Sequence, residues 1–334
     1  MRPEPFKKWT RPFRLRLRLG RYLSATLKAW HLKLVDGVGP WNVVEIVRDG
    51  RAVVLRLPGL KEIGDDRIHF YYRVFLPVII YLFSRTQPSV ERVVAVLSDG
   101  SADASNRLLF SGNLANAILV PDPEFFNTHG YALLRQKLKE QRPWPERNAQ
   151  IVWRGATSGL GRPIDNSLDC YAPDIRQRIR MCGFLKGLSN VDAKIYRVVQ
   201  AQNPQNVLEL LKQAGIFGDY VAGITWLDKK FAIDVDGNTN AWSNLFTRML
   251  YGCCVIKIAS PQKFRQWYYD RLVPWKHFIP VRADLTDLVE RIEWCRSHLT
   301  ECREIAVASQ ELALSMTFDS ETRYAIELIN RRLG

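Results

Sequence analysis

Short apolar runs of strand length alternate with helix-like segments through the second half of this 334-residue chain. Strand-like runs cover residues 150–153, 231–235, 254–258 and 278–281. Helical spacing predicts helices over 174–185, 207–214, 245–251 and from residue 284 onward. Because strands that alternate with helices form parallel sheets, this half is predicted to be an α/β unit, with ligands bound beyond the carboxyl ends of its strands.

The first half opens with a hairpin signal. Residues 43–47 and 52–57 are largely apolar and β-branched, and Asp49-Gly50 lies between them. Further strands are predicted at 93–97, 107–110 and 117–120, followed by a helix over 131–140. The breaker-rich link QRPWPE at 141–146 is the candidate domain boundary. The predicted division is therefore a leader (1–34), an N-terminal domain (35–145), a C-terminal domain (146–300) and terminal helices (301–334) that pack back on the N-terminal domain.

Positive charge is concentrated at the start of the chain. The whole chain has 48 basic and 34 acidic residues, a net charge of +14. Residues 1–34 hold ten Lys/Arg against one Glu, so +9 lies in this leader and +5 in the rest. Aromatic and Leu residues interleave with the arginines, which favours an anionic membrane surface as partner. The alternative is a solvated basic arm.

Neither a spanning segment nor a disulfide scaffold is predicted. The longest apolar run, residues 74–83, is interrupted by Pro77 and falls short of the ~20 residues that a spanning helix needs, so we interpret it as core. The leader lacks the apolar region of a secretory signal. The six cysteines show no metal-ligand spacing and are predicted to be reduced, mostly buried thiols. The expected location is the cytoplasm, with the leader as the candidate contact to the inner membrane.

The segment WRGATSGLGR at 153–162 runs from a strand into a turn with three glycines, two hydroxyls and two arginines. Glycines let the backbone approach an anion, and N–H groups with Arg side chains bind phosphate oxygens. The glycine spacing matches neither a Walker loop nor a dinucleotide fingerprint. A surface turn with solvated arginines is the alternative for this segment taken alone.

A second segment, FAIDVDGNTNAWSN at 231–244, begins as a buried strand and becomes a polar turn. Asp234 and Asp236 are two residues apart and could face the same side of a strand. They could share a metal ion, but we favour capping and Asx hydrogen bonds. Trp242 is available to stack on a ring. The aromatic residues of 257–281 could form a sugar platform or core, and core is favoured for Trp275 and Phe278.

Three segments together resemble glycosyltransferase family 90: WRGATSG at 153–159, KFAIDVDGNTNAWSNLF at 230–246 and QWYYDRLVPWKHFIPVRADLTDL at 266–288. They occur in the order found in that family, which includes animal protein O-glucosyltransferases, capsule-associated xylosyltransferases of yeast and bacterial lipopolysaccharide-modifying enzymes. The segment QWYYDRL within 266–288 resembles the sequences of the bacterial branch. The resemblance implies an α/β fold of the GT-B type, in which two Rossmann-like domains face each other across a cleft, and chemistry that inverts the anomeric carbon.

The resemblance also implies residue roles. Asp99, at the end of an apolar strand, corresponds to the catalytic base, and Arg162 to the ligand of the donor diphosphate. The other donor-binding residues implied are Arg154, Gly155, Ala156, Ser158, Asn238, Asn240, Trp242, Ser243, Asn244 and Arg248. Asp122 and Phe126 are the acceptor-side candidates. No metal ligand is expected.

This chain departs from the animal members at three places. Leu245 stands where they have a donor-binding arginine, and Arg248, one helical turn later, is the candidate replacement. Ala156 stands where they have a serine, so a contact there would use the backbone. Their acceptor-side tyrosine has no obvious counterpart in residues 121–131.

The implied activity is metal-independent transfer of glucose or xylose from a UDP-sugar to a hydroxyl of a lipopolysaccharide or other glycan, without a cofactor. Guanidinium groups and backbone N–H groups would neutralise the departing diphosphate, and a carboxylate would take the acceptor proton. Three rival interpretations are a Mn-dependent transferase of the GT-A type using Asp234 and Asp236, a basic nucleic-acid-binding protein, and an inactive sugar-binding relative.

Overall fold

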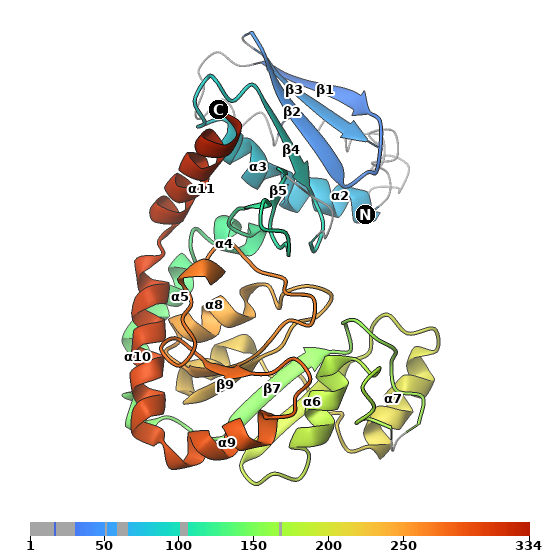
Figure 1. The fold of residues 1–334 in the computed structure, drawn as a ribbon, viewed down its shortest axis with the longest axis vertical. Helices are drawn as coiled ribbons and strands as arrows, with labels where there is room; N and C mark the ends of the chain where they lie inside the picture. Colours follow the sequence, from blue (N-terminus) through green and yellow to red (C-terminus); the bar gives the residue numbers. More distant parts are fainter. Residues whose placement is uncertain (1–16, 18–30, 51, 59–65, 101–105, 167–168) are drawn as a thin grey trace, which may run out of the picture. The chain divides into compact units, whose positions relative to one another are not determined.

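The computed structural model describes residue 17 and residues 31–50, 52–58, 66–100, 106–166 and 169–334, which form two compact units. Unit 1 comprises the described residues up to Gly130 together with Arg265–Trp267 and Thr317–Gly334. Unit 2 comprises Tyr131–Phe264 and Tyr268–Met316 (Figure 1). The boundary expected at 145/146 therefore lies inside unit 2, and the last helix belongs to unit 1. Apart from residues 17 and 31–34, the basic leader and its expected membrane contact lie outside the described residues.

Unit 1 is built on a six-stranded mixed sheet, in the order β1-β3-β2-β4-β5-β6. The strands are β1 (His31–Gly37), β2 (Val43–Asp49), β3 (Ala52–Pro58), β4 (Arg92–Val96), β5 (Leu108–Leu109) and β6 (Ile118–Leu119). The predicted hairpin is confirmed, since β2 and β3 pair antiparallel and Gly50 has a φ of 55°. This hairpin, with the antiparallel β2–β4 pair, makes the sheet mixed. β1, which the sequence analysis did not predict, pairs parallel with β3.

The helices of unit 1 are α2 (Asp66–Val74), α3 (Leu76–Phe83), α4 (Pro123–Asn127) and α11 (Phe318–Leu333). Seven of the eight residues of α3 are buried, so the prediction that the apolar run 74–83 is core is confirmed. α11 packs against α3, and the Asn330 side chain accepts a hydrogen bond from the Gln87 N–H at 2.8 Å. Within the described part of the chain, none of the helices has the length and apolar character to cross a membrane.

Unit 2 contains a five-stranded sheet, all parallel, in the order β11-β10-β9-β7-β8. The strands are β7 (Ile151–Ala156), β8 (Val191–Arg197), β9 (Phe231–Asp234), β10 (Cys254–Ile258) and β11 (Ile279–Val281). The helices are α5 (Ala132–Lys137), α6 (Gln177–Leu185), α7 (Pro204–Gln213), α8 (Ser243–Leu250), α9 (Leu288–Ser297) and α10 (Leu299–Ser315). Numbered within the unit, the strand order is 2-1-3-4-5, which is a doubly wound order whose switch point lies between β7 and β9.

These two units confirm the predicted α/β fold class, and two sheet-centred units are the components of a GT-B fold. The cleft between domains stays a prediction. All six cysteines are free and buried, as predicted. The prediction that Trp275 belongs to the core was wrong, because this residue has a φ of 64° in the turn before β11 and its side chain is 43% exposed. There it packs edge-on against Trp294.

Candidate functional site

The glycine turn, residues 157–161, follows β7 directly, and hydrogen bonds from neighbouring segments fix its backbone. The Thr157 hydroxyl and the backbone of Val199 bond each other in both directions at 2.8 Å. Arg176 donates to the carbonyl oxygens of Thr157 and Gly161 at 2.9 and 3.2 Å. Gly161 has a φ of +100°, and a Cβ there would lie 2.5 Å from the Asp174 carbonyl oxygen. Only glycine therefore fits this backbone.

The second polar segment follows β9 and lies against the glycine turn. A Cβ on Gly237 would come within 2.9 Å of the Ser158 Oγ, and one on Gly159 within 3.4 Å of the Gly237 carbonyl oxygen. The residues in contact, 78 and 79 positions apart in sequence, make the two turns close neighbours in space. They meet at the carboxyl ends of β7 and β9, which is the switch point of the sheet.

Arg178 joins the two turns, although the sequence analysis did not single it out. Its guanidinium donates to the Ser158 Oγ at 2.9 Å, and to the carbonyl oxygens of Asp236 at 2.9 Å and Val235 at 3.2 Å. Burial lowers the pKa of Arg178, and the charges of Asp236 and Asp234 oppose that shift. The only sequence signal was the abundance of arginine in the 174–185 helix.

Beneath the second turn, Asp234 is fully buried and both of its oxygens are engaged. The Lys257 Nζ lies 2.8 Å from Oδ2, and the Asn244 side chain donates to Oδ1 at 2.8 Å. The Asn240 side chain donates to the Phe264 carbonyl oxygen and the Tyr269 hydroxyl at 3.1 and 3.3 Å. Asn240 and Asn244, both predicted as donor-binding, thus belong to this buried network. In the described residues, no group of three His, Cys, Asp or Glu side chains could hold a metal ion.

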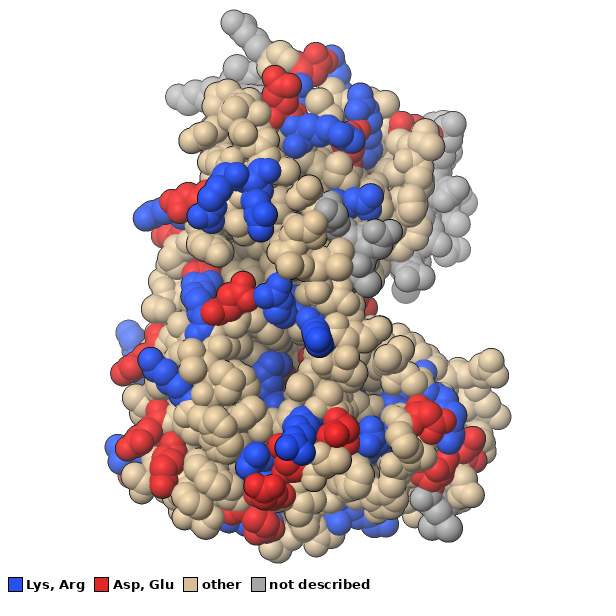
Figure 2. Space-filling view, viewed as in Figure 1, with Lys and Arg blue, Asp and Glu red and all other residues tan. Residues whose placement is uncertain are grey.

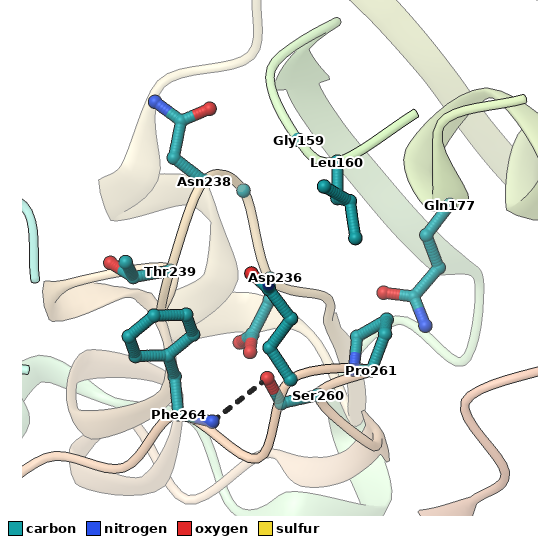
Figure 3. Close-up of a pocket in the computed structure, with 11 residues that line it drawn as sticks. Gly159, Leu160, Gln177, Asp236, Asn238, Thr239, Ser260, Pro261 and Phe264 are labelled. Atoms are coloured by element: carbon teal, nitrogen blue, oxygen red, sulfur yellow. Dashed lines mark hydrogen bonds between the residues drawn. The ribbon is translucent and has the colours of Figure 1, made fainter. Parts of the chain in front are cut away.

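A small pocket opens between the two turns and the segment after β10, with a cavity volume of about 20 Å³ (Figure 3). Because a water needs roughly 10–15 Å³ of such volume, the pocket admits one or two groups of that size. It is lined by Gly159, Leu160, Gln177, Asp236, Gly237, Asn238, Thr239, Ser260, Pro261, Gln262 and Phe264. The lining comes from the carboxyl ends of β7, β9 and β10 and the start of α6.

Asp236 lines this pocket and is 4% exposed. Neither of its carboxylate oxygens has a hydrogen-bond partner within the described residues. Burial raises the pKa of Asp236 to about 6, while the charge of Lys257 lowers it and that of Asp234 raises it further. The Ser260 hydroxyl and the Asn240 side chain also lower this pKa, yet neither has hydrogen-bond geometry to the carboxylate.

The predicted donor-binding arginines are engaged within unit 2. Arg154 pairs with Asp192 at 2.6 Å and donates to the Asp219 carbonyl oxygen at 2.8 Å. Arg248 is buried, lies 4.0 Å above the Trp226 ring and donates to the Gly223 carbonyl oxygen at 3.1 Å. Neither arginine is among the described residues that line the pocket. Asn238, another predicted donor-binding residue, does line it.

Arg162, the predicted diphosphate ligand, is surrounded by carboxylates. It pairs with Asp174 at 2.5 Å, Asp169 at 2.6 Å and Asp165 at 2.9 Å. The hydrogen bonds to Asp174 and Asp169 raise its pKa, so it stays charged. The cluster carries a formal charge of −2, so a diphosphate at Arg162 has to compete with three carboxylates.

The other predicted donor-side residues lie in β7, the turn after it and the start of α8. Gly155 allows Trp153 to pack, since a Cβ would lie 2.3 Å from that ring. The Ala156 carbonyl oxygen accepts a long hydrogen bond from Arg178 at 3.4 Å. Trp242 has a φ of 49° where α8 begins, and the Ser243 carbonyl oxygen accepts from the Thr247 hydroxyl. Leu245, the position at which the resemblance implies an arginine in the animal members, is buried in the core.

In unit 1, Asp99 lies in a bend beyond the carboxyl end of β4. The Tyr71 hydroxyl donates to Asp99 Oδ1 at 3.4 Å, and the Tyr71 ring packs 5.1 Å from that of Trp41. Asp99 is half-buried at this strand end, and its role as a base stays a prediction. Its placement opposite Arg162 stays a prediction.

Both acceptor-side candidates are buried in unit 1. Asp122 caps α4 by accepting hydrogen bonds from the N–H groups of Glu124 and Phe125 at 2.8 and 2.9 Å. Burial raises the pKa of Asp122 to about 7. The Phe126 ring packs against those of Tyr81 and Phe318, at 5.0 and 5.4 Å. Their contacts thus support α4 and the core around it.

Comparison with known proteins places this geometry in context. The chain is 52% identical to the uncharacterized protein 027R of Frog virus 3 over 184 residues, covering 52% of this chain and 18% of that protein. It is 34% identical to protein O-glucosyltransferase 2 of Danio rerio over 101 residues, covering 29% of this chain and 20% of that protein. The chain thus spans at most a fifth of the length of these two relatives.

A solved glycosyltransferase from Rickettsia africae is 14% identical, with a TM-score of 0.38, and the match covers 68% of this chain and 57% of that one. The family model described as glycosyl transferase family 90 matches residues 118–332. That range contains both turns, the pocket between them and all of unit 2's sheet. The chain belongs to glycosyl transferase family 90.

Proposed function

We propose that the chain is an inverting, metal-independent glycosyltransferase that moves a sugar from a UDP-sugar to a hydroxyl of a lipopolysaccharide or other glycan. One observation carries this proposal. Two family motifs, far apart in sequence, meet at the carboxyl ends of β7 and β9, at the switch point of a parallel sheet. Open α/β sheets bind nucleotides at that point.

The proposed donor site uses the glycine turn to hold the diphosphate. As the bond to the sugar breaks, negative charge grows on the leaving phosphate. Backbone N–H groups of residues 158–161 and the guanidinium of Arg162 would stabilise that charge. The carboxylates around Arg162 hold its guanidinium beside the turn, and a bound diphosphate would displace one or more of them.

The proposed base is Asp99, which would take the proton of the acceptor hydroxyl as it attacks. General-base catalysis typically contributes about 10²–10⁴-fold to the rate.

Glucose and xylose are the proposed sugars, and the zebrafish relative's name, protein O-glucosyltransferase 2, makes UDP-glucose the first donor to test. Contact of residues 1–34 with an anionic membrane, from the cytoplasmic side, is part of the same proposal.

Two of the three rival interpretations are less well supported. A Mn-dependent mechanism would use Asp234 and Asp236, but both Asp234 oxygens are taken by Lys257 and Asn244. For a nucleic-acid-binding protein we would expect an extended basic surface. Acidic and basic side chains are instead interspersed over the face shown in Figure 2.

The direct experiment is UDP release by the purified chain from UDP-glucose, UDP-xylose and UDP-galactose, with GDP-mannose as the control. We expect hydrolysis or thermal stabilisation with one or more UDP-sugars, and the same rate in EDTA. The absence of both effects with every UDP-sugar would contradict the proposal. A strict Mn²⁺ requirement would favour the mechanism through Asp234 and Asp236 instead.

A further inference from the structure

Asp236 is the one charged group of the pocket whose hydrogen-bonding capacity is unused in the described residues. It is 4% exposed, it lines the pocket, and both oxygens lack a partner. An unsatisfied buried carboxylate is costly, so a protein rarely keeps one without a use. Figure 3 shows Asp236 in the middle of the lining residues, between the turn of Asn238 and the segment from Ser260 to Phe264.

The charges around Asp236 determine what kind of group it binds. Asp234 and Asp236 carry two negative charges, and Lys257 and Arg178 carry two positive charges close to them. Because this cluster is already neutral, a metal ion or an ammonium group would add an unbalanced charge. Neutral donors fit better. A carboxylate with two unused oxygens accepts from two neighbouring O–H groups, and the pocket volume of about 20 Å³ has room for them.

We propose that Asp236 accepts hydrogen bonds from two neighbouring hydroxyl groups of the nucleotide-sugar donor. The proposal rests on the proposed function, because it places the donor at the pocket between the glycine turn and Asn238. Two parts of a UDP-sugar offer such a pair: the ribose, through its 2′ and 3′ hydroxyls, and the transferred sugar. Leu160, Pro261 and Phe264 add apolar walls that suit the C–H faces of either ring.

The test measures dissociation constants by calorimetry for the full chain, Asp236→Asn and Asp236→Ala. Asp219→Asn, an exposed site in the same unit, is the control with the same charge change. One arm compares UDP with 2′-deoxy-UDP, and the other compares UDP-glucose with UDP. In the wild type we expect the two dissociation constants of one comparison to differ by about 10- to 100-fold, which is the contribution of a hydrogen bond to a charged group.

In Asp236→Ala the difference in dissociation constant should disappear, and in Asp236→Asn it should shrink, while Asp219→Asn should keep it. If the difference between UDP and 2′-deoxy-UDP is the one lost, Asp236 binds the ribose. If the difference between UDP-glucose and UDP is the one lost, Asp236 binds the transferred sugar. UDP binding with both comparisons unchanged in the Asp236 variants would overturn this inference alone. A wild-type chain that binds neither UDP nor UDP-glucose would overturn the proposed function and this inference with it.

A pH series separates binding by Asp236 from a structural role. UDP-glucose has no phosphate that titrates near pH 6, so its affinity should fall between pH 7 and pH 5 as Asp236 gains a proton. Asp236→Asn should remove that fall. A wild-type affinity that is constant over this range, or a fall that persists unchanged in Asp236→Asn, contradicts the inference. The groups facing Asp236 are Asp234 on β9, Lys257 on β10, Arg178 on α6, and Ser260, Asn240 and Tyr269.

Discussion

Arginine residues of unit 2 serve two different purposes. Arg176 and Arg178 are tied to backbone carbonyl oxygens of the two turns and fix their shape. Arg162 instead makes ion pairs with three carboxylates on a half-exposed loop. Its bonds are to side chains that can rotate away, whereas backbone carbonyl oxygens cannot. Of these three arginines beside the glycine turn, we therefore propose Arg162 as the one that exchanges its present partners for a phosphate.

At the residue scale, Arg162→Ala should weaken UDP binding by about 10- to 100-fold, the effect of losing a charge-assisted hydrogen bond. The measurement is the UDP dissociation constant at fixed ionic strength. Arg303→Ala, an exposed site on α10, controls for the loss of one positive charge. Unchanged UDP affinity in Arg162→Ala would remove this residue from the donor site and leave it a purely structural role in its loop.

Residue types could be predicted from the sequence better than their partners. Composition and motif predicted a glycine-rich turn in 153–162 and a polar turn at the end of 231–244, and the structure brings these two turns together. Phosphate binding by the first turn stays a prediction. The partners of Asp234 could not be predicted, because Lys257 comes from a neighbouring strand and only the sheet register brings the two together. For Asp234 and Asp236 the favoured interpretation was a cap and an Asx hydrogen bond, and it was wrong. Asp234 bonds to the side chains of Lys257 and Asn244, and Asp236 has no hydrogen-bond partner among the described residues, which only the three-dimensional structure reveals.

At the scale of elements, the shape of the glycine turn depends on its close contacts. The segment around Gly161 forms a short parallel bridge, in which the Arg162 N–H donates to the Asp174 carbonyl oxygen at 3.0 Å. The Arg176 N–H donates to the Arg162 carbonyl oxygen at 3.1 Å. A side chain at position 161 would enter this bridge.

Gly161→Ala should destabilise unit 2 by about 2–4 kcal/mol, because alanine at positive φ is strained and its Cβ overlaps a carbonyl oxygen. The measurement is chemical denaturation. Gly223→Ala is the matched control, since a Cβ there meets nothing closer than 3.9 Å and its φ is not positive. Equal stability of Gly161→Ala and wild type would show that the turn can relax and is not fixed as described.

Element types were predictable where the pattern was strong. The hairpin and the strand–helix alternation of unit 2 are confirmed, because turn chemistry and periodicity act over a few residues. β8 was not predicted, although Val191, Ala193 and Ile195 alternate with polar residues, since its charged positions hide the apolar ones. The predicted helix from residue 284 begins instead at Leu288, where Asp287 accepts from the Arg282 N–H.

At the scale of the whole molecule, sequence order and unit membership differ. Thr317–Gly334 and Arg265–Trp267 belong to unit 1, although the chain around them builds unit 2. Within unit 1, the Trp267 indole donates to the buried Glu321 at 2.9 Å, and Phe318 stacks on His129 at 4.0 Å. Local pattern could not predict this, because the contacts join residues more than 50 positions apart.

In the proposed function, unit 2 binds the donor and Asp99 of unit 1 removes the acceptor proton. The most direct measurement is the UDP affinity of Asp99→Asn beside its transfer rate, with Asp319→Asn on α11 as the exposed control. We expect the variant to bind UDP as tightly as wild type, while transfer falls by about 10²–10⁴-fold. Transfer at the wild-type rate, or an equal loss of UDP binding and transfer, would contradict the assignment of Asp99 as the base.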